Sequence, residues 1–146
     1  MISIEPPDDM ISISLYNILT YRKEEEYLNL LNNWDKTIMF EIDDFYPVNI
    51  EFSGDQITFK RTEPQKKADL KIKMSLETLL DIAYGRMNPV KAFISGKLKI
   101  KGFYKIFTLN RFMKIFLDTI KMMAEDPNDK YYKLTINQRG KDNDGN

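Results

Sequence analysis

The sequence predicts an α+β domain in which a mostly antiparallel sheet is covered by helices. Two observations lead to this fold class. Short segments between residues 37 and 101 alternate apolar with polar side chains, as half-buried strands do. Segments at both ends of the chain instead repeat their apolar residues with helical spacing. With 146 residues, of which 42% are hydrophobic, the chain is long enough for one core, so we expect one domain.

The first helical region is expected from about Ser14 to Trp34. Its apolar residues form one cluster before and one cluster after the charged run at residues 22–26. At 100° per residue the two clusters point about a right angle apart, so we expect a kink or break in that run. Residues 1–13 are predicted to be a flexible segment ahead of the domain.

Three strands are predicted next, near residues 37–42, 48–52 and 57–60. Short polar links join them, including the turn Ser53-Gly54-Asp55, so they form an antiparallel meander. A longer polar connection leads to a fourth alternating strand at residues 70–74.

The fourth strand runs into a short amphipathic helix that Ser75 caps and Gly85 ends. Pro89 opens another short helix, which stops at Gly96. A fifth strand is expected at residues 97–101, where apolar residues alternate with lysines.

The last helix is expected at about residues 103–125. Its apolar side chains exceed a single stripe, and deep burial, a homodimer face or the wall of a cavity would each account for the surplus. Residues 131–138 are a candidate sixth, edge strand, which would end a domain spanning 14–138, and residues 139–146 are expected to be a disordered tail. The predicted buried stripe of the last helix consists of Ile106, Leu109, Met113, Phe116, Leu117, Ile120 and Met123.

Composition excludes several classes of function. The 22 basic residues balance the 22 acidic ones, so no long-range field favours nucleic acid. The chain has no His and no Cys, and therefore lacks thiolates and the usual zinc ligands and general base. We predict no catalytic residues, no metal and no cofactor, and we expect a cytoplasmic protein because the N-terminus lacks the basic start and apolar run of a signal peptide.

Lysines recur at the outward positions of the predicted strands. They serve either solubility and edge protection or docking on anionic lipid headgroups. Glu41 and Glu51 fall on the same face and would partly neutralise them, which favours the first interpretation. The lysines concerned are Lys60, Lys71, Lys73, Lys97, Lys99 and Lys101.

One stretch of the chain resembles the sterol carrier protein family, the type-two or non-specific lipid-transfer proteins. In order, it contains Ala68-Asp69 opening a strand, a Leu-rich helix, Gly85-Arg86-Met87-Asn88-Pro89, Ala92-Phe93, and Gly96-Lys97-Leu98-Lys99-Ile100-Lys101-Gly102. The resemblance implies a five-stranded sheet with helices on one face, enclosing an apolar tunnel for a fatty-acyl, phospholipid, isoprenoid or sterol-like molecule; the candidate strand at residues 131–138 would be a sixth. It implies no catalysis.

A non-catalytic lipid carrier is therefore the predicted function. The alternative is an accessory module whose core is filled by its own side chains and which self-associates or presents a lipid substrate to an enzyme. Expected partners are a lipid or fatty-acyl ligand and, transiently, a membrane surface; we expect a monomer or weak homodimer. The candidate lining consists of Ile82, Met87, Phe93, Ile94, Leu98, Ile100, Phe103, Ile106, Phe107, Phe112 and Phe116.

Overall fold

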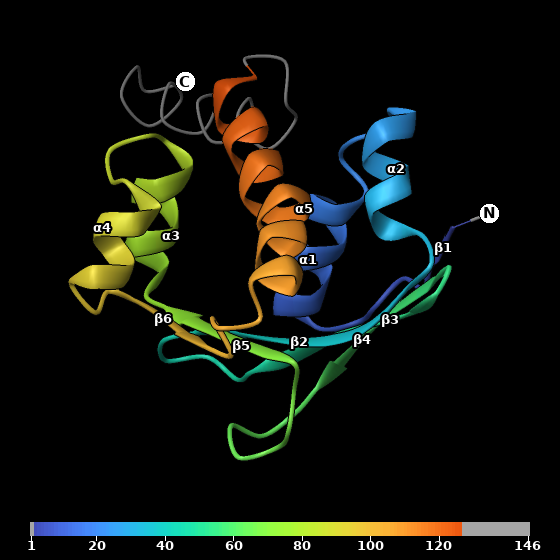
Figure 1. Ribbon diagram of the computed structural model, residues 1–146, viewed down its shortest axis with the longest axis horizontal. Helices are drawn as coiled ribbons and strands as arrows, with labels where there is room; N and C mark the ends of the chain where they lie inside the picture. The colour runs from blue at the N-terminus through green and yellow to red at the C-terminus, as the bar shows by residue number, and fades with distance from the viewer. Residues whose placement is uncertain (1, 127–146) are drawn as a thin grey trace, which may run out of the picture.

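The computed structural model describes residues 2–126, and within that range a six-stranded sheet carries five helices on one face (Figure 1). The α+β class and the mostly antiparallel sheet are thus as predicted. In space the strands follow the order β1-β4-β3-β2-β5-β6. The strands are β1 (Ser3–Ile4), β2 (Trp34–Ile42), β3 (Val48–Gly54), β4 (Gln56–Arg61), β5 (Leu70–Met74) and β6 (Leu98–Lys101).

The centre of the sheet is the predicted meander, in which β2, β3 and β4 pair antiparallel. The chain then crosses below the sheet to bring β5 beside β2 in parallel, and β6 pairs antiparallel with β5 (Figure 1). The inward residues of the central strands, such as Ile38, Ile50 and Leu70, are completely buried under the helices. They fix the register, since a slip by one residue would turn these side chains outward.

The edge of the sheet differs from the prediction. Ser3–Ile4, which we assigned to the flexible segment, form β1 and pair in parallel with β4. A two-residue strand carries too little alternation to be recognised in a sequence. The candidate edge strand at residues 131–138 lies outside the described residues.

The first helical region is divided into α1 (Met10–Leu19) and α2 (Glu25–Leu31), with a complete break at the charged run. Our predicted start at Ser14 is wrong by one turn, because the Asp9 carboxylate accepts a hydrogen bond from the Ser12 amide at 2.9 Å and caps the helix earlier. Trp34 is also not helical, as it begins β2.

The second half of the chain folds as two short helices, a strand and a long helix: α3 (Leu76–Ala83), α4 (Pro89–Ile94), β6 and α5 (Ile106–Glu125). The Ser75 hydroxyl accepts from the Thr78 amide at 3.0 Å and caps α3, as expected. Gly102 has φ +87°, a conformation that favours glycine, and it precedes a turn that delays the start of α5 to Ile106.

The buried face of α5 is rotated relative to the predicted stripe. Ile106 is exposed, and Leu109, Met113 and Leu117 are only partly buried. Two polar residues mislead a pattern based on hydrophobicity, since Thr108 and Thr119 are buried, and the Thr119 hydroxyl donates to the Ile115 carbonyl at 2.6 Å. The face that is buried consists of Thr108, Phe112, Ile115, Phe116, Thr119 and Ile120.

Candidate functional site

An apolar cavity lies where α3 and α4 meet α5 above the β5–β6 end of the sheet. Its volume is about 20 Å³, roughly what one water molecule requires. An acyl chain does not fit in this conformation, so binding one requires the walls to move apart. The lining consists of Ile72, Met74, Leu79, Ile82, Pro89, Leu98, Met113, Phe116, Leu117 and Ile120.

Three structural devices position the walls of the cavity. The Ser75 cap fixes the start of α3, which directs Leu79 and Ile82 toward α5. The Asn88 side chain accepts from the Val90 amide at 2.8 Å and starts α4, with Pro89 at its first turn. Alternation along β5 and β6 turns their apolar residues toward the helices and forms the floor.

All the lining side chains are apolar. The cavity thus offers no group that could act as a nucleophile, a general base or a metal ligand, and no hydrogen bond for a headgroup. Its only chemical property is exclusion of water, which suits an aliphatic chain or ring system.

Helix α3 carries exposed apolar side chains on its outer side. Leu76, Leu80 and Tyr84 follow one another with helical spacing and are all exposed, next to the half-buried Leu79 and Ala83. The apolar arc of α3 is therefore continuous from the cavity wall to the solvent.

The structure brings only part of the predicted lining to this cavity. Ile82, Leu98 and Phe116 are among the lining residues, while Met87 and Ile100 pack, partly buried, against the core. Phe112 does not line the cavity; it is fully buried and stacked on Phe116 with ring centroids 5.6 Å apart.

The other predicted lining residues lie at the surface, outside the cavity. They belong to the outer side of α4, to the connection after β6, and to the first turn of α5, whose buried face is rotated away from them. They are Phe93, Ile94, Phe103, Ile106 and Phe107.

Several lining residues were not among our candidates. Met113, Leu117 and Ile120 stand at helical spacing on the side of α5 that faces α3, and all three were in the stripe that we assigned to the core. Ile72 and Met74 alternate along β5 toward the same space. The apolar spacing of these residues was visible in the sequence. It could not show which apolar residues of α5 face the sheet and which face α3.

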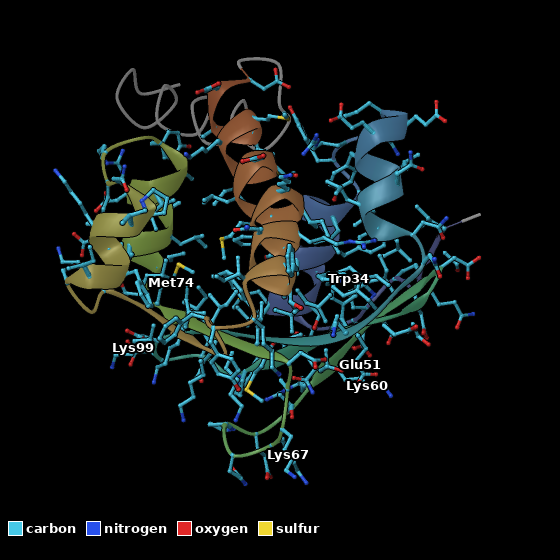
Figure 2. The ribbon with its side chains drawn as sticks, in the orientation of Figure 1. Trp34, Glu51, Lys60, Lys67, Met74 and Lys99 are labelled. Carbon is cyan, nitrogen blue, oxygen red and sulfur yellow. The ribbon has the colours of Figure 1, made fainter. Side chains whose placement is uncertain are left out.

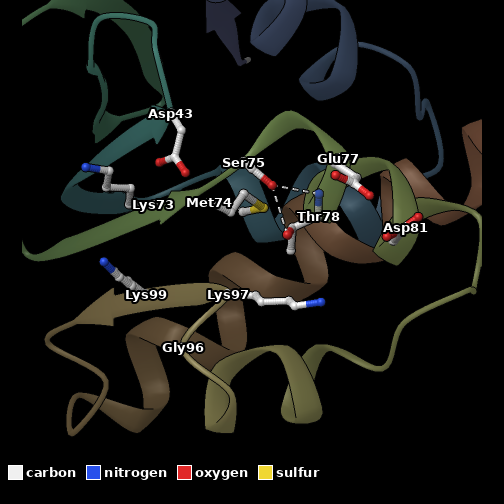
Figure 3. Close-up of a pocket in the computed structure, with 10 residues that line it drawn as sticks. All are labelled: Asp43, Lys73, Met74, Ser75, Glu77, Thr78, Asp81, Gly96, Lys97 and Lys99. Carbon is white, nitrogen blue, oxygen red and sulfur yellow. Dashed lines mark hydrogen bonds between the residues drawn. The ribbon is translucent and has the colours of Figure 1, made fainter.

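A second, polar depression opens beside the first turns of α3, with a volume of about 280 Å³ (Figure 3). Figure 3 shows that the Ser75 hydroxyl is engaged with Thr78, so it serves as a helix cap. Asp81 at the rim pairs with Arg86 at 2.8 Å. Acidic and lysine side chains line the depression together. Among its lining residues, all of them in the described part of the chain, no nucleophile is hydrogen-bonded to a general base, so the depression does not resemble a catalytic site.

The sheet and its covering helices define an α+β domain with a small apolar space between its two layers. Residues 16–116, more than half of the chain, match the model of the SCP-2 sterol transfer family. The protein belongs to that family. No curated protein matches the sequence itself.

Solved structures share the fold at low sequence identity. Sterol carrier protein domain 2 of Helicoverpa armigera is 21% identical, with 85% of this chain and 98% of that chain covered and a TM-score of 0.57. A crystal structure of sterol carrier protein 2 is 19% identical, with 75% and 89% covered and a TM-score of 0.51. A protein described as UbiJ-SCP2, a ubiquinone synthesis protein, is 21% identical, with 80% and 90% covered and a TM-score of 0.53.

Membership of this family supports lipid binding or transfer in general terms. Within residues 2–126, none of the helices combines the length and the apolar character needed to cross a bilayer.

Proposed function

We propose that the protein is a non-catalytic carrier that holds one lipid-like molecule, with a fatty-acyl, phospholipid, isoprenoid or sterol skeleton, in an expanded form of the cavity between α3–α4 and α5. The single observation that carries this proposal is the wholly apolar lining of the space between these elements. An ordinary core does not need exposed apolar side chains on the outer side of the helix that covers it, yet α3 has such side chains.

The cavity would open by an outward movement of α3 and α4. Gly85 and Gly96 flank α4 in left-handed conformations, with φ +77° and +81°. A Cβ added at either position would meet no atom within 4 Å outside the adjacent residues, so there is open space on the side-chain side of both links. We infer that α3 and α4 can separate from α5 while β6 and the sheet stay in place.

Energetics favour exchange over storage. Burial of a methylene is worth about 0.8 kcal/mol, so a sixteen-carbon chain gains on the order of 12 kcal/mol on leaving water. A bilayer gives the chain nearly the same gain, so transfer between bilayer and protein is close to neutral. Because no polar group lines the cavity, we expect weak discrimination between headgroups.

The test is native mass spectrometry of the purified full chain after exposure to palmitate and to a mixed phospholipid pool. The wild type should show one lipid adduct per chain. Leu79→Glu should lose the adduct, because a carboxylate in the cavity wall is incompatible with a buried alkyl chain. Leu80→Glu is the matched control: it places the same charge one residue away on the exposed side of α3 and should keep the adduct.

Thermal melts of both variants show whether Leu79→Glu remains folded. Adducts of equal intensity in the two folded variants would refute the cavity as the binding site. Full occupancy by a single species from the mixed pool would refute the weak headgroup selectivity.

The small size of the closed cavity favours one alternative, an accessory module with a filled core that self-associates or presents a lipid substrate to an enzyme. The likeness to a ubiquinone synthesis protein is compatible with such a role. In that case the same spectra would show a dimer peak and would lack the lipid adduct. Both proposals place the protein in the cytoplasm and assign it no catalytic step.

A further inference from the structure

The outer face of the β5–β6 pair sets lysine directly against lysine. In the register of this pair Lys71 faces Lys101 and Lys73 faces Lys99. Like charges in directly opposed positions destabilise a sheet. The arrangement therefore costs folding stability, and such local conflicts occur where a surface serves a function.

The neighbouring carboxylates relieve only part of this charge. Glu41 pairs with Lys73 at 3.7 Å, and Glu51 pairs with Lys60 at 3.3 Å. This partial neutralisation by Glu41 and Glu51 is as expected from the sequence, but the paired lysines lie on β5 and β4 and not on β6. Within residues 2–126, Lys99 and Lys101 form no ion pair, and Figure 2 shows Lys99 on the side of the sheet away from the helices.

An exposed apolar surface adjoins β6 at both of its ends. Phe93 of α4 contacts Phe103 after β6 with ring centroids 5.4 Å apart, and Tyr104 lies 6.5 Å from Phe103. Ile94 is 78% exposed and Phe107, in the first turn of α5, is 90% exposed. We call this surface the apolar edge; it consists of Phe93, Ile94, Phe103, Tyr104, Ile106 and Phe107.

We propose that β6 and the apolar edge form a docking surface for an anionic phospholipid bilayer. Aromatic and aliphatic side chains next to lysines match the membrane interface, where rings enter the headgroup region and lysines contact anionic lipids. A second copy of the chain fits this surface poorly, because a two-fold contact would bring Lys99 and Lys101 of both copies together.

The docking surface also adjoins the cavity. Two of the lining residues, Leu98 of β6 and Pro89 of α4, belong to the elements that would rest on the bilayer. If the proposed carrier function holds, a lipid would pass between bilayer and cavity on this side of the molecule. Docking itself does not depend on that function and is measured without lipid loading.

The experiment is flotation of the full chain with two kinds of vesicle, phosphatidylcholine alone and phosphatidylcholine with about one third phosphatidylserine. Wild-type protein should float with the anionic vesicles, less so as salt is raised, and poorly with the neutral ones. The double variant Lys99→Glu/Lys101→Glu should lower the bound-to-free ratio about tenfold or more. Ile94→Ser/Phe107→Ser should lower it on the same scale.

The matched control is Lys23→Glu/Leu28→Ser at the α2 end of the molecule, opposite α4 (Figure 1). It removes one exposed lysine and one exposed apolar residue and should bind like the wild type. All substituted side chains are exposed, and thermal melts check that each variant is folded.

Equal flotation with both vesicles, or equal flotation of the β6 variant and the control, would overturn the proposal. A wild-type dimer that Ile94→Ser/Phe107→Ser dissociates would also overturn it, by assigning the apolar edge to a second copy.

Discussion

Lys73 on β5 and Lys99 on β6 face each other directly across the edge of the sheet. Of these two lysines, only Lys73 has a carboxylate partner among residues 2–126, which is Glu41 at 3.7 Å. Substitution Lys99→Glu would replace this repulsion by a cross-strand pair of opposite charges. We expect the free energy of unfolding to rise by about 0.2–1 kcal/mol, measured by urea denaturation at low salt.

Lys60→Glu is the matched comparison for this prediction. It breaks the pair that Lys60 forms with Glu51 at 3.3 Å and sets two carboxylates together. It should therefore lower stability, whereas Lys99→Glu raises it. If both substitutions changed the free energy of unfolding by the same amount, the repulsion between the opposed lysines would be too small to measure. A more stable Lys99→Glu protein that binds anionic vesicles less would indicate that stability is given up at β6 for docking.

The aromatic residues of α5, which the sequence grouped as one lining, should differ in their effect on stability. Phe112 is completely buried and stacks on Phe116 with the ring planes 9° apart, while Phe107 is 90% exposed. Phe112→Ala should cost about 3–5 kcal/mol of unfolding free energy. Phe107→Ala should change it by less than about 0.5 kcal/mol. Urea denaturation of the two single variants measures both, and similar losses would contradict the placement of α5.

Most of the fold could be predicted from the sequence because local signals agreed with one another. The alternation in β2, β3 and β4 and the short links between them require an antiparallel meander. Ser75, Pro89 and the glycines separate the elements of the second half at nearly their observed boundaries. Where side chain, cap and turn residue all favour one structure, little is left for tertiary contacts to decide.

The site was less predictable, since it depends on which neighbour each apolar side chain meets. A hydrophobicity pattern cannot distinguish Phe103, Phe107 and Phe112. In the structure only Phe112 of these three lies in the core, because α5 starts after the turn at Gly102 and its buried face includes two threonines. The short β1 pairs with a strand more than fifty residues later, which no local pattern encodes.

Gly102 should be the least replaceable of the glycines in the described part of the chain. A Cβ at this position, with φ +87°, would lie 2.6 Å from the Asp69 carbonyl oxygen. Gly102→Ala adds that clash to the strain of a left-handed backbone, so we expect a loss of about 2–4 kcal/mol. Gly96→Ala is the control, because φ is +81° there and no atom lies within 4 Å of the new Cβ.

Gly96→Ala should lower the free energy of unfolding only by the strain of the left-handed backbone, about 1 kcal/mol. Both values follow from thermal or urea unfolding. If the two variants were equally stable, the close approach of β6's end to Asp69 would not be present in solution.

Stability should also fall at high pH because of Tyr27. Its ring is completely buried, and its hydroxyl donates to the Leu19 carbonyl at 2.8 Å. Burial raises the pKa of Tyr27 above the ordinary value of 10.0. Above about pH 10 the unfolded chain therefore releases this proton while the folded protein still holds it, so the unfolded state is favoured progressively as pH rises.

Tyr27→Phe should weaken this alkaline loss, although at neutral pH it should cost about 1 kcal/mol, because the Leu19 carbonyl loses its donor. Urea midpoints of the wild type and of Tyr27→Phe between about pH 8 and 11 measure the slopes. An unaltered slope in Tyr27→Phe would mean that this phenol does not bind its proton more tightly in the folded state, and that the α1–α2 junction is open to water.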